Sequence, residues 1–134
     1  MKRNSLVSIL ITNHNKEPFL VKNLKSCLKQ NYKNKEIIFF DDKSTDQSLK
    51  VVKKFKRIKL IKNQKKINKS KPLNQINAII NCYKKSKGKI IFLLDSDDYF
   101  NKKKLSIIVK KFIDDDKLEF LQDIPVFSDN NKNS

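Results

Sequence analysis

The chain has 134 residues, a formal net charge of +17 and 38% hydrophobic residues. This length predicts one domain over residues 1–134, with a core at 5–113 and a weakly patterned tail at 114–134. A single glycine excludes the GxGxxG and GxxxxGKS/T phosphate-binding loops, and one histidine with two cysteines is too few for a zinc site. No apolar run is long enough to span a bilayer, so the cytoplasm is the expected location.

The positive charge comes almost entirely from lysine, which supplies 29 of the 31 basic residues. Two interpretations are open, a solvated lysine-rich surface and a surface that binds polyanions. The first is favoured because lysine, asparagine and isoleucine share A/T-rich codons, and because arginine, which suits base and phosphate recognition, is rare. The aromatic residues lie mainly in apolar runs, which counts against a nucleic-acid-binding module. A secondary attraction to anionic donors or to lipids at the inner face of a membrane fits the same charge.

The first half of the chain contains the patterns of two strands and two helices. Residues 6–12 predict a strand buried on both faces, and Pro18 then opens a helix that runs to about residue 30. Residues 36–40 predict a second buried strand. The N-cap candidates of the next helix are Ser44, Thr45 and Asp46, and its buried residues are Leu49, Val52 and Phe55.

The second half continues the alternation. Residues 58–61 predict a short strand, residues 62–72 a loop, and residues 89–94 a fourth, buried strand. The helix before that strand stops near Gly88, the expected place for a C-terminal cap. The apolar residues of this third helix are Leu73, Ile76, Ile79, Ile80 and Tyr83, and those of a fourth are Leu105, Ile108, Val109 and Phe112.

The predicted order is therefore β-α-β-α-β-α-β-α. Such alternation indicates right-handed βαβ units, and hence a Rossmann-like three-layer α/β/α sandwich with a mostly parallel sheet. Cys27 and Cys82 fall in apolar helical patterns far apart in sequence, which favours buried free thiols.

Polar clusters follow three of the predicted strands, at residues 12–15, 41–42 and 95–98. Ligands of open α/β sheets bind outside the carboxyl ends of the strands, where all three clusters should lie. Asp95, Asp97 and Asp98 directly follow an apolar run, and Mg²⁺ or Mn²⁺ shared with substrate phosphates would compensate their charge. The alternative is an aspartate-rich turn that caps the next helix, and the spacing favours the metal.

Two further residues of these clusters have open interpretations. Asp42 either accepts a hydrogen bond from a nucleobase or caps the helix after Ser44. His14 either stacks its ring on a base or lies half-exposed in a loop.

These clusters belong to longer segments that resemble family 2 glycosyltransferases of the GT-A fold. Residues 7–17 (VSILITNHNKE) resemble the opening of that family, and residues 30–38 (QNYKNKEII) followed by 41–46 (DDKSTD) resemble its next segment. Residues 87–98 (KGKIIFLLDSDD) are similar to the strand that leads into its DxD motif. The resemblance covers about residues 6–112, most of the chain.

The resemblance implies a nucleotide-diphosphate sugar as donor and inverting transfer to the hydroxyl of a saccharide, lipid-linked or protein acceptor. It places Thr12 and His14 against the nucleoside, Glu17 near the nucleotide and Asp42 on the base. Asp95 and Asp97 form the DxD pair, which with Asp98 would hold Mn²⁺ or Mg²⁺ on the diphosphate.

The chain departs from the family pattern in two places. Residues 77–82 (NAIINC) replace an asparagine and a small residue or glycine that the family often carries before Gly88. The catalytic base of the family lies well beyond the DxD motif, so we expect it beyond residue 134 and the GT-A-type fold to be truncated. Asp123 and Asp129 are available carboxylates that match no pattern of the family.

Three alternatives remain beside a glycosyltransferase donor domain. A non-catalytic relative would bind nucleotide or a partner without transfer, and a nucleic-acid-binding module would use the lysines. A receiver-like phosphoacceptor is disfavoured, because its paired acids follow the first strand rather than the second.

Overall fold

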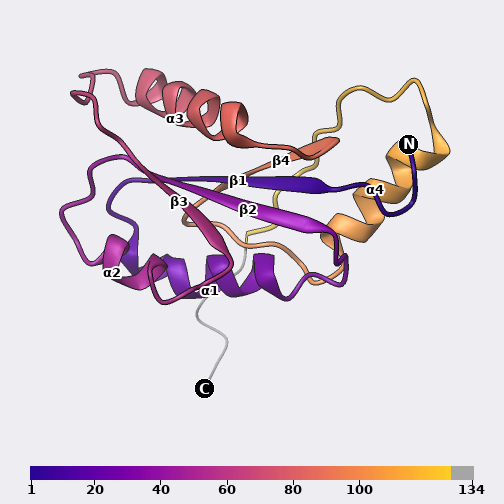
Figure 1. The fold of residues 1–134 in the computed structure, drawn as a ribbon, viewed down its shortest axis with the longest axis horizontal. Coiled ribbons are helices and arrows are strands. Elements are labelled where there is room, and N and C mark those ends of the chain that lie inside the picture. The colour runs from indigo at the N-terminus through magenta and orange to yellow at the C-terminus, as the bar shows by residue number, and fades with distance from the viewer. Residues whose placement is uncertain (128–134) are drawn as a thin grey trace.

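The computed structural model describes residues 1–127 and contains four strands that alternate with four helices (Figure 1). The order agrees with the sequence prediction, and most ends agree within two residues. The elements are β1 (Val7–Asn13), α1 (Glu17–Leu28), β2 (Lys35–Asp41), α2 (Ser48–Val52), β3 (Ile58–Lys62), α3 (Lys71–Lys85), β4 (Ile90–Asp95) and α4 (Lys104–Asp114).

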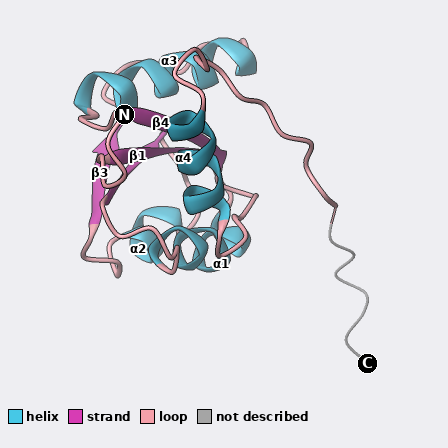
Figure 2. Ribbon diagram, turned by 90° about the vertical axis from the view of Figure 1, so that its right-hand side faces the viewer, coloured by secondary structure: helices cyan, strands magenta, loops and turns pink. Residues whose placement is uncertain are grey.

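All strand pairs in the sheet are parallel, and the strand order is β3-β2-β1-β4. The chain runs outward from β1 to β3 and then returns through α3 to place β4 on the other side of β1. Figures 1 and 2 show α3 on one side of the sheet, with α1 and α2 on the opposite side. This arrangement confirms the predicted three-layer α/β/α fold.

Two apolar clusters fill the spaces between the layers. The larger one joins alternate residues of β1, β2 and β4 to α1, α2 and α4, with Ile9, Phe39 and Leu105 fully buried. The smaller one packs Leu10 and Ile38, from the other face of the sheet, against α3. Because both faces of β1 and β2 are covered, these strands contain long apolar runs instead of alternating polar residues.

The outer face of α3 contains most of the large apolar residues that the sequence shows in this helix. Its large apolar residues lie in solvent, with Ile76 52% and Tyr83 61% exposed, whereas the small residues Ala78 and Cys82 are buried against the sheet. Helical periodicity shows which residues share a face, but it does not show which face packs inward.

Gly88 is not a C-terminal cap, contrary to the prediction. α3 ends at Lys85 with Ser86 as C-cap, and no glycine has a positive φ. A Cβ atom on Gly88 would lie 2.5 Å from the backbone nitrogen of Ser8 in β1. The sequence position therefore needs glycine for a close approach between backbones, not for a left-handed conformation.

The second helix is also shorter than predicted. α2 begins at Ser48 with Gln47 as N-cap and ends at Val52, so Phe55 packs on the core from beyond the helix. Asp46 still serves the start of this helix, because its Oδ1 accepts the N–H of Ser48 at 2.9 Å.

The remaining expectations concern the cysteines and the chain end. Cys27 and Cys82 are buried free thiols, as predicted, and burial raises the pKa of each to about 12. Residues 115–127 contain no helix or strand, although Leu121 packs against the larger core. Among the described residues, no helix has the length and hydropathy needed to cross a membrane.

Candidate functional site

The register of the sheet brings the three polar clusters to one edge. β1 lies between β2 and β4, where Asn13 is paired with Asp41 and Thr12 with Asp95. We refer to residues 12–15, 41–46 and 95–98, at and after the carboxyl ends of these strands, as the rim. Ligands of open α/β sheets bind at such an edge, next to the strand where the winding direction reverses.

Asp41 holds the rim together rather than facing a ligand. The residue is 1% exposed, and its carboxylate accepts hydrogen bonds from Asn13 Nδ2 and the backbone N–H of Ser44, both at 3.0 Å. Asn15, which has a φ of 51°, adds a second link, because its Oδ1 accepts the N–H of Thr45 at 2.7 Å. These bonds fix the loop after β1 to the loop after β2. The two asparagines belong to the polar cluster predicted at residues 12–15, but the sequence did not indicate this role for them.

Asp42 and His14 lie side by side on this fixed platform. The Nδ1–H of His14 donates to the carbonyl oxygen of Asp42 at 2.7 Å, which assigns the proton to Nδ1 because a carbonyl only accepts. Asn63, just after β3, donates from Nδ2 to Asp42 Oδ1 at 2.6 Å and so orients the carboxylate. Asp42 does not cap the next helix, since the N-cap Gln47 has no side-chain capping bond. Asn63 was not recognised from the sequence, where it falls in a lysine-rich loop.

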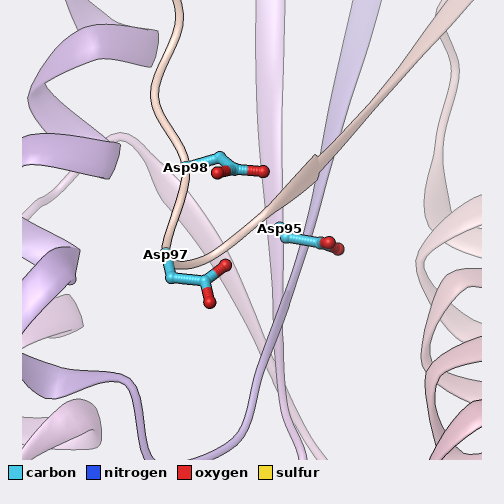
Figure 3. Close-up of side chains that lie close together, drawn as sticks. All are labelled: Asp95, Asp97 and Asp98. Atoms are coloured by element: carbon cyan, nitrogen blue, oxygen red, sulfur yellow. The ribbon is translucent and has the colours of Figure 1, made fainter. Parts of the chain in front are cut away.

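The aspartate cluster consists of Asp95, Asp97 and Asp98, on the turn that ends β4 (Figure 3). One carboxylate oxygen from each lies within 4.8 Å of the others, and all three residues are exposed. Partial burial and the neighbouring charges of Asp97 and Asp95 raise the pKa of Asp98. The cluster does not cap α4, which begins at Lys104 with no side-chain capping bond.

This donor set fits a hard divalent cation. Three carboxylates supply only oxygen ligands, and their mutual repulsion is relieved when a cation binds between them. Their exposure leaves room for water and for phosphate oxygens, which Mg²⁺ and Mn²⁺ accept as further ligands.

Two side chains from other elements contact the aspartate cluster. Lys16, just before α1, places its Nζ 3.1 Å from Asp97 Oδ2. Gln75 of α3 donates from Nε2 to Asp95 Oδ1 at 2.7 Å. The sequence offered no indication of either contact, because both connect residues that are far apart in the chain.

Polar residues on one face of α1 hold the backbone of the aspartate turn. Asn23, which is fully buried, donates from Nδ2 to the carbonyl oxygens of Asp95 at 3.0 Å and Asp98 at 2.8 Å. Ser26, further along α1, accepts the N–H of Phe100 at its Oγ at 3.1 Å. Gln30, two residues beyond the end of α1, accepts the N–H of Leu105 at its Oε1 at 3.0 Å. The spacing of three residues places Asn23 and Ser26 on one face of the helix.

Glu17 lies beside the rim but is engaged with the backbone. Its Oε2 accepts the N–H of Gln47 at 3.1 Å, and its own N–H donates to Asp46 Oδ2 at 3.0 Å. Of the other carboxylates considered, Asp123 forms an ion pair with Lys104, and Asp129 lies outside the described residues.

Known proteins are similar to this chain in sequence and in fold. A family model described as Glycosyl transferase family 2 matches residues 8–134. The chain belongs to this family. The resemblance expected from the sequence is thereby confirmed over more of the chain than residues 6–112.

Two curated members of glycosyl transferase family 2 illustrate the similarity. The UDP-Glc:alpha-D-GlcNAc-diphosphoundecaprenol beta-1,3-glucosyltransferase WfaP of Escherichia coli is 39% identical over 104 residues, which cover 75% of this chain and 39% of WfaP. The poly(ribitol-phosphate) beta-N-acetylglucosaminyltransferase TarS of Staphylococcus aureus is 32% identical over 101 residues, which cover 73% of this chain and 17% of TarS. The chain thus corresponds to well under half the length of these relatives.

Solved structures agree on the fold. Residues 1–349 of S. aureus TarS in complex with UDP superpose with a TM-score of 0.68 and 27% identity, over 81% of this chain and 32% of that one. A mannosyltransferase from Pyrobaculum calidifontis, 19% identical, has the same TM-score over 79% of this chain and 32% of its own. The chain has the GT-A-type α/β fold of these glycosyltransferases.

Proposed function

We propose that the rim binds a nucleotide-diphosphate sugar together with Mn²⁺ or Mg²⁺, and that the protein serves inverting transfer of the sugar to an acceptor hydroxyl. The observation that carries this proposal is the placement of Thr12, Asp42 and the aspartate cluster at the carboxyl ends of three adjacent parallel strands. Family membership supports it, as does the UDP-GlcNAc complex of TarS, which is 28% identical to this chain.

In this proposal the nucleoside lies over the loop after β1. The ring of His14, held through Nδ1 by the Asp42 carbonyl, stacks on the base beside Thr12. The carboxylate of Asp42 accepts an N–H of the base, in an orientation that Asn63 fixes. Glu17 contributes indirectly, because its bond to Gln47 positions the loop that contains Asp46.

The aspartate cluster would hold the cation against the diphosphate. When bound, a divalent cation neutralises the negative charge that grows on the departing nucleotide diphosphate. Asp95, Asp97 and Asp98 supply the ligands, and Asn23 keeps their backbone in place. Lys16 lies close enough to add positive charge on the same side. The acceptor is a saccharide, lipid-linked or protein hydroxyl in polysaccharide biosynthesis.

The whole chain acts in this proposal as one domain with its core at residues 5–113. The proposed location of the protein is the cytoplasm, with peripheral contact at the inner face of a membrane.

Calorimetry tests the donor site directly. We expect UDP-glucose or UDP-N-acetylglucosamine to bind in the presence of Mn²⁺ and to lose most of its affinity after chelation with EDTA. Asp97→Asn should abolish the metal-dependent part of the affinity, whereas Asp116→Asn, at another exposed aspartate in the segment after α4, should leave it unchanged. GDP-mannose tests a donor with a different base. If none of the three nucleotide sugars binds in the presence of Mn²⁺ or Mg²⁺, the proposal is wrong. Donor binding without any sugar transfer or UDP release would instead favour a non-catalytic nucleotide-binding relative.

A further inference from the structure

The outer face of α3 carries a row of exposed apolar side chains. The spacing of these residues, three, four and three along the helix, places them in one line. They lie opposite Ala78 and Cys82, which face the sheet. The row, which we name the α3 stripe, consists of Leu73 (41% exposed), Ile76 (52%), Ile80 (44%) and Tyr83 (61%).

The surroundings of the α3 stripe are strongly basic. Residues 63–89, which comprise α3 and the loops on either side of it, contain eight lysines and not one aspartate or glutamate. Exposed lysines stand at both ends of the helix. They are Lys69 and Lys71 before the stripe, and Lys84, Lys85 and Lys87 after it.

We infer that the α3 stripe docks on an anionic lipid surface, with the helix parallel to the plane of the membrane. An amphipathic helix of this kind inserts its apolar side between the head groups, while lysines at its flanks contact anionic lipids. Tyr83 suits such an interface, because its ring is apolar and its hydroxyl remains hydrated. The assignment explains why large aliphatic side chains face outward and why no acidic residue lies in α3 and its flanking loops, residues 63–89.

Charge and side-chain type argue against two other occupants. A second copy of the chain would bring two surfaces of the same positive sign together, which costs association free energy. A nucleic acid would need exposed aromatic or arginine side chains for stacking and base contacts, whereas the stripe is mainly aliphatic and residues 63–89 contain no arginine.

The docked surface lies next to the rim. Gln75 of α3 donates to Asp95 of the aspartate cluster, so a membrane that contacts this helix is close to the proposed donor site. The vesicle experiment below needs neither metal nor nucleotide, so its result is independent of donor binding.

Vesicle flotation with the full chain tests the inference. We expect the protein to float with vesicles of phosphatidylcholine and phosphatidylglycerol, and to remain unbound with vesicles of phosphatidylcholine alone. High salt should weaken binding without abolishing it, because part of the affinity comes from buried apolar area.

Substitutions with matched controls locate the surface. Ile76→Ser combined with Ile80→Ser should lower the partition coefficient by about tenfold or more. Val21→Ser combined with Ile107→Ser is the control, since these residues are 45% and 52% exposed on α1 and α4. Circular dichroism should be unchanged in both variants, and any fall in melting temperature should be similar in the two, because all four side chains are about half exposed.

A charge-reversal pair tests the lysines in the same way. Lys84→Glu with Lys85→Glu should reduce flotation strongly, whereas Lys102→Glu with Lys103→Glu, which are exposed before α4, should reduce it less.

Three results would overturn the inference. The first is failure of the wild-type chain to float with anionic vesicles. The second is equal loss of flotation in the Ile76/Ile80 and Val21/Ile107 variants. The third is a double variant, Ile76→Ser with Ile80→Ser, that still binds vesicles normally but no longer binds a DNA duplex or no longer forms a dimer in sedimentation. Such a result would assign the stripe to nucleic acid or to a second copy of the chain.

Discussion

At the scale of single residues, the candidate site depends on side chains that orient other side chains. The carboxylate of Asp42 is oriented by a hydrogen bond from Asn63, and the backbone of the aspartate cluster is held by hydrogen bonds from Asn23 of α1. Asn23 is fully buried, so its two hydrogen bonds to carbonyl oxygens replace those that water would make. These supports place the proposed ligands before any donor binds, and such preorganisation lowers the free-energy cost of binding.

Lys16 provides a test at this scale, because its ammonium group lies next to Asp97 at the place where a cation is proposed. Replacing Lys16 with methionine removes the positive charge and keeps a side chain of similar size and reach. The affinity for Mn²⁺ alone should then rise roughly two- to fivefold, as expected for one partly exposed charge pair. Titration calorimetry in the absence of nucleotide measures this, with Lys25→Met on the exposed side of α1 as control. Unchanged or weaker Mn²⁺ binding would contradict the arrangement.

The sequence identified the ligand candidates of the site but not their supports. Asp42, Asp95 and Asp97 follow apolar runs, a local pattern that is visible in the chain. Asn63 and Gln75 become recognisable only through contacts 20 or more residues away in sequence. The chain contains fifteen asparagines and five glutamines, and neither Asn63 nor Gln75 lies in a local pattern that singles it out.

At the scale of elements, α3 and the strand after it show how packing decides what periodicity leaves open. The small side chains Ala78 and Cys82 let the helix approach the sheet closely, and the larger ones are therefore left outside. The chain then passes Gly88, whose N–H donates to Ser8 Oγ at 2.9 Å. Gly88 thus fixes how β4 joins β1.

Gly88→Ala should destabilise the fold by about 1–3 kcal/mol, because the new methyl group would meet the backbone of Val7 and Ser8 at less than 3 Å. Urea unfolding followed by circular dichroism measures the change. Lys87→Ala is the matched control, since it alters an exposed side chain next to Gly88. Equal stability of the two variants would show that the strand can shift to admit a methyl group.

At the scale of the whole molecule, a carboxylate at the start of β2 connects several elements. Glu36 accepts hydrogen bonds from Ser8 Oγ of β1 and from the backbone N–H of Lys87, both at 2.6 Å, and from Lys59 Nζ of β3 at 2.7 Å. Partial burial favours the neutral acid, but the three donors outweigh it and lower the pKa of Glu36 below its ordinary value of 4.5. Its ionised form therefore stabilises the folded state.

This connection predicts a pH-dependent stability difference. A carboxyl group with a lowered folded pKa stabilises the protein above its unfolded value, and this contribution disappears as the pH falls through the folded value. Glu36→Gln should therefore cost about 1 kcal/mol at pH 7 and progressively less below pH 4.5. Chemical unfolding from pH 7 to pH 3 measures the difference, with Glu119→Gln in the exposed segment after α4 as control. A difference that does not change with pH would contradict the assigned role.

The sequence by itself determined the order of strands and helices, the family and the aspartates at the strand ends. Each of these depends on neighbouring residues: apolar runs, caps and short motifs. The tertiary structure decided the strand order β3-β2-β1-β4, the outward direction of the α3 stripe and the need for glycine at position 88. It also decided which side chains hold the rim. These features depend on contacts between distant segments, whose register is fixed only when the two apolar clusters pack together.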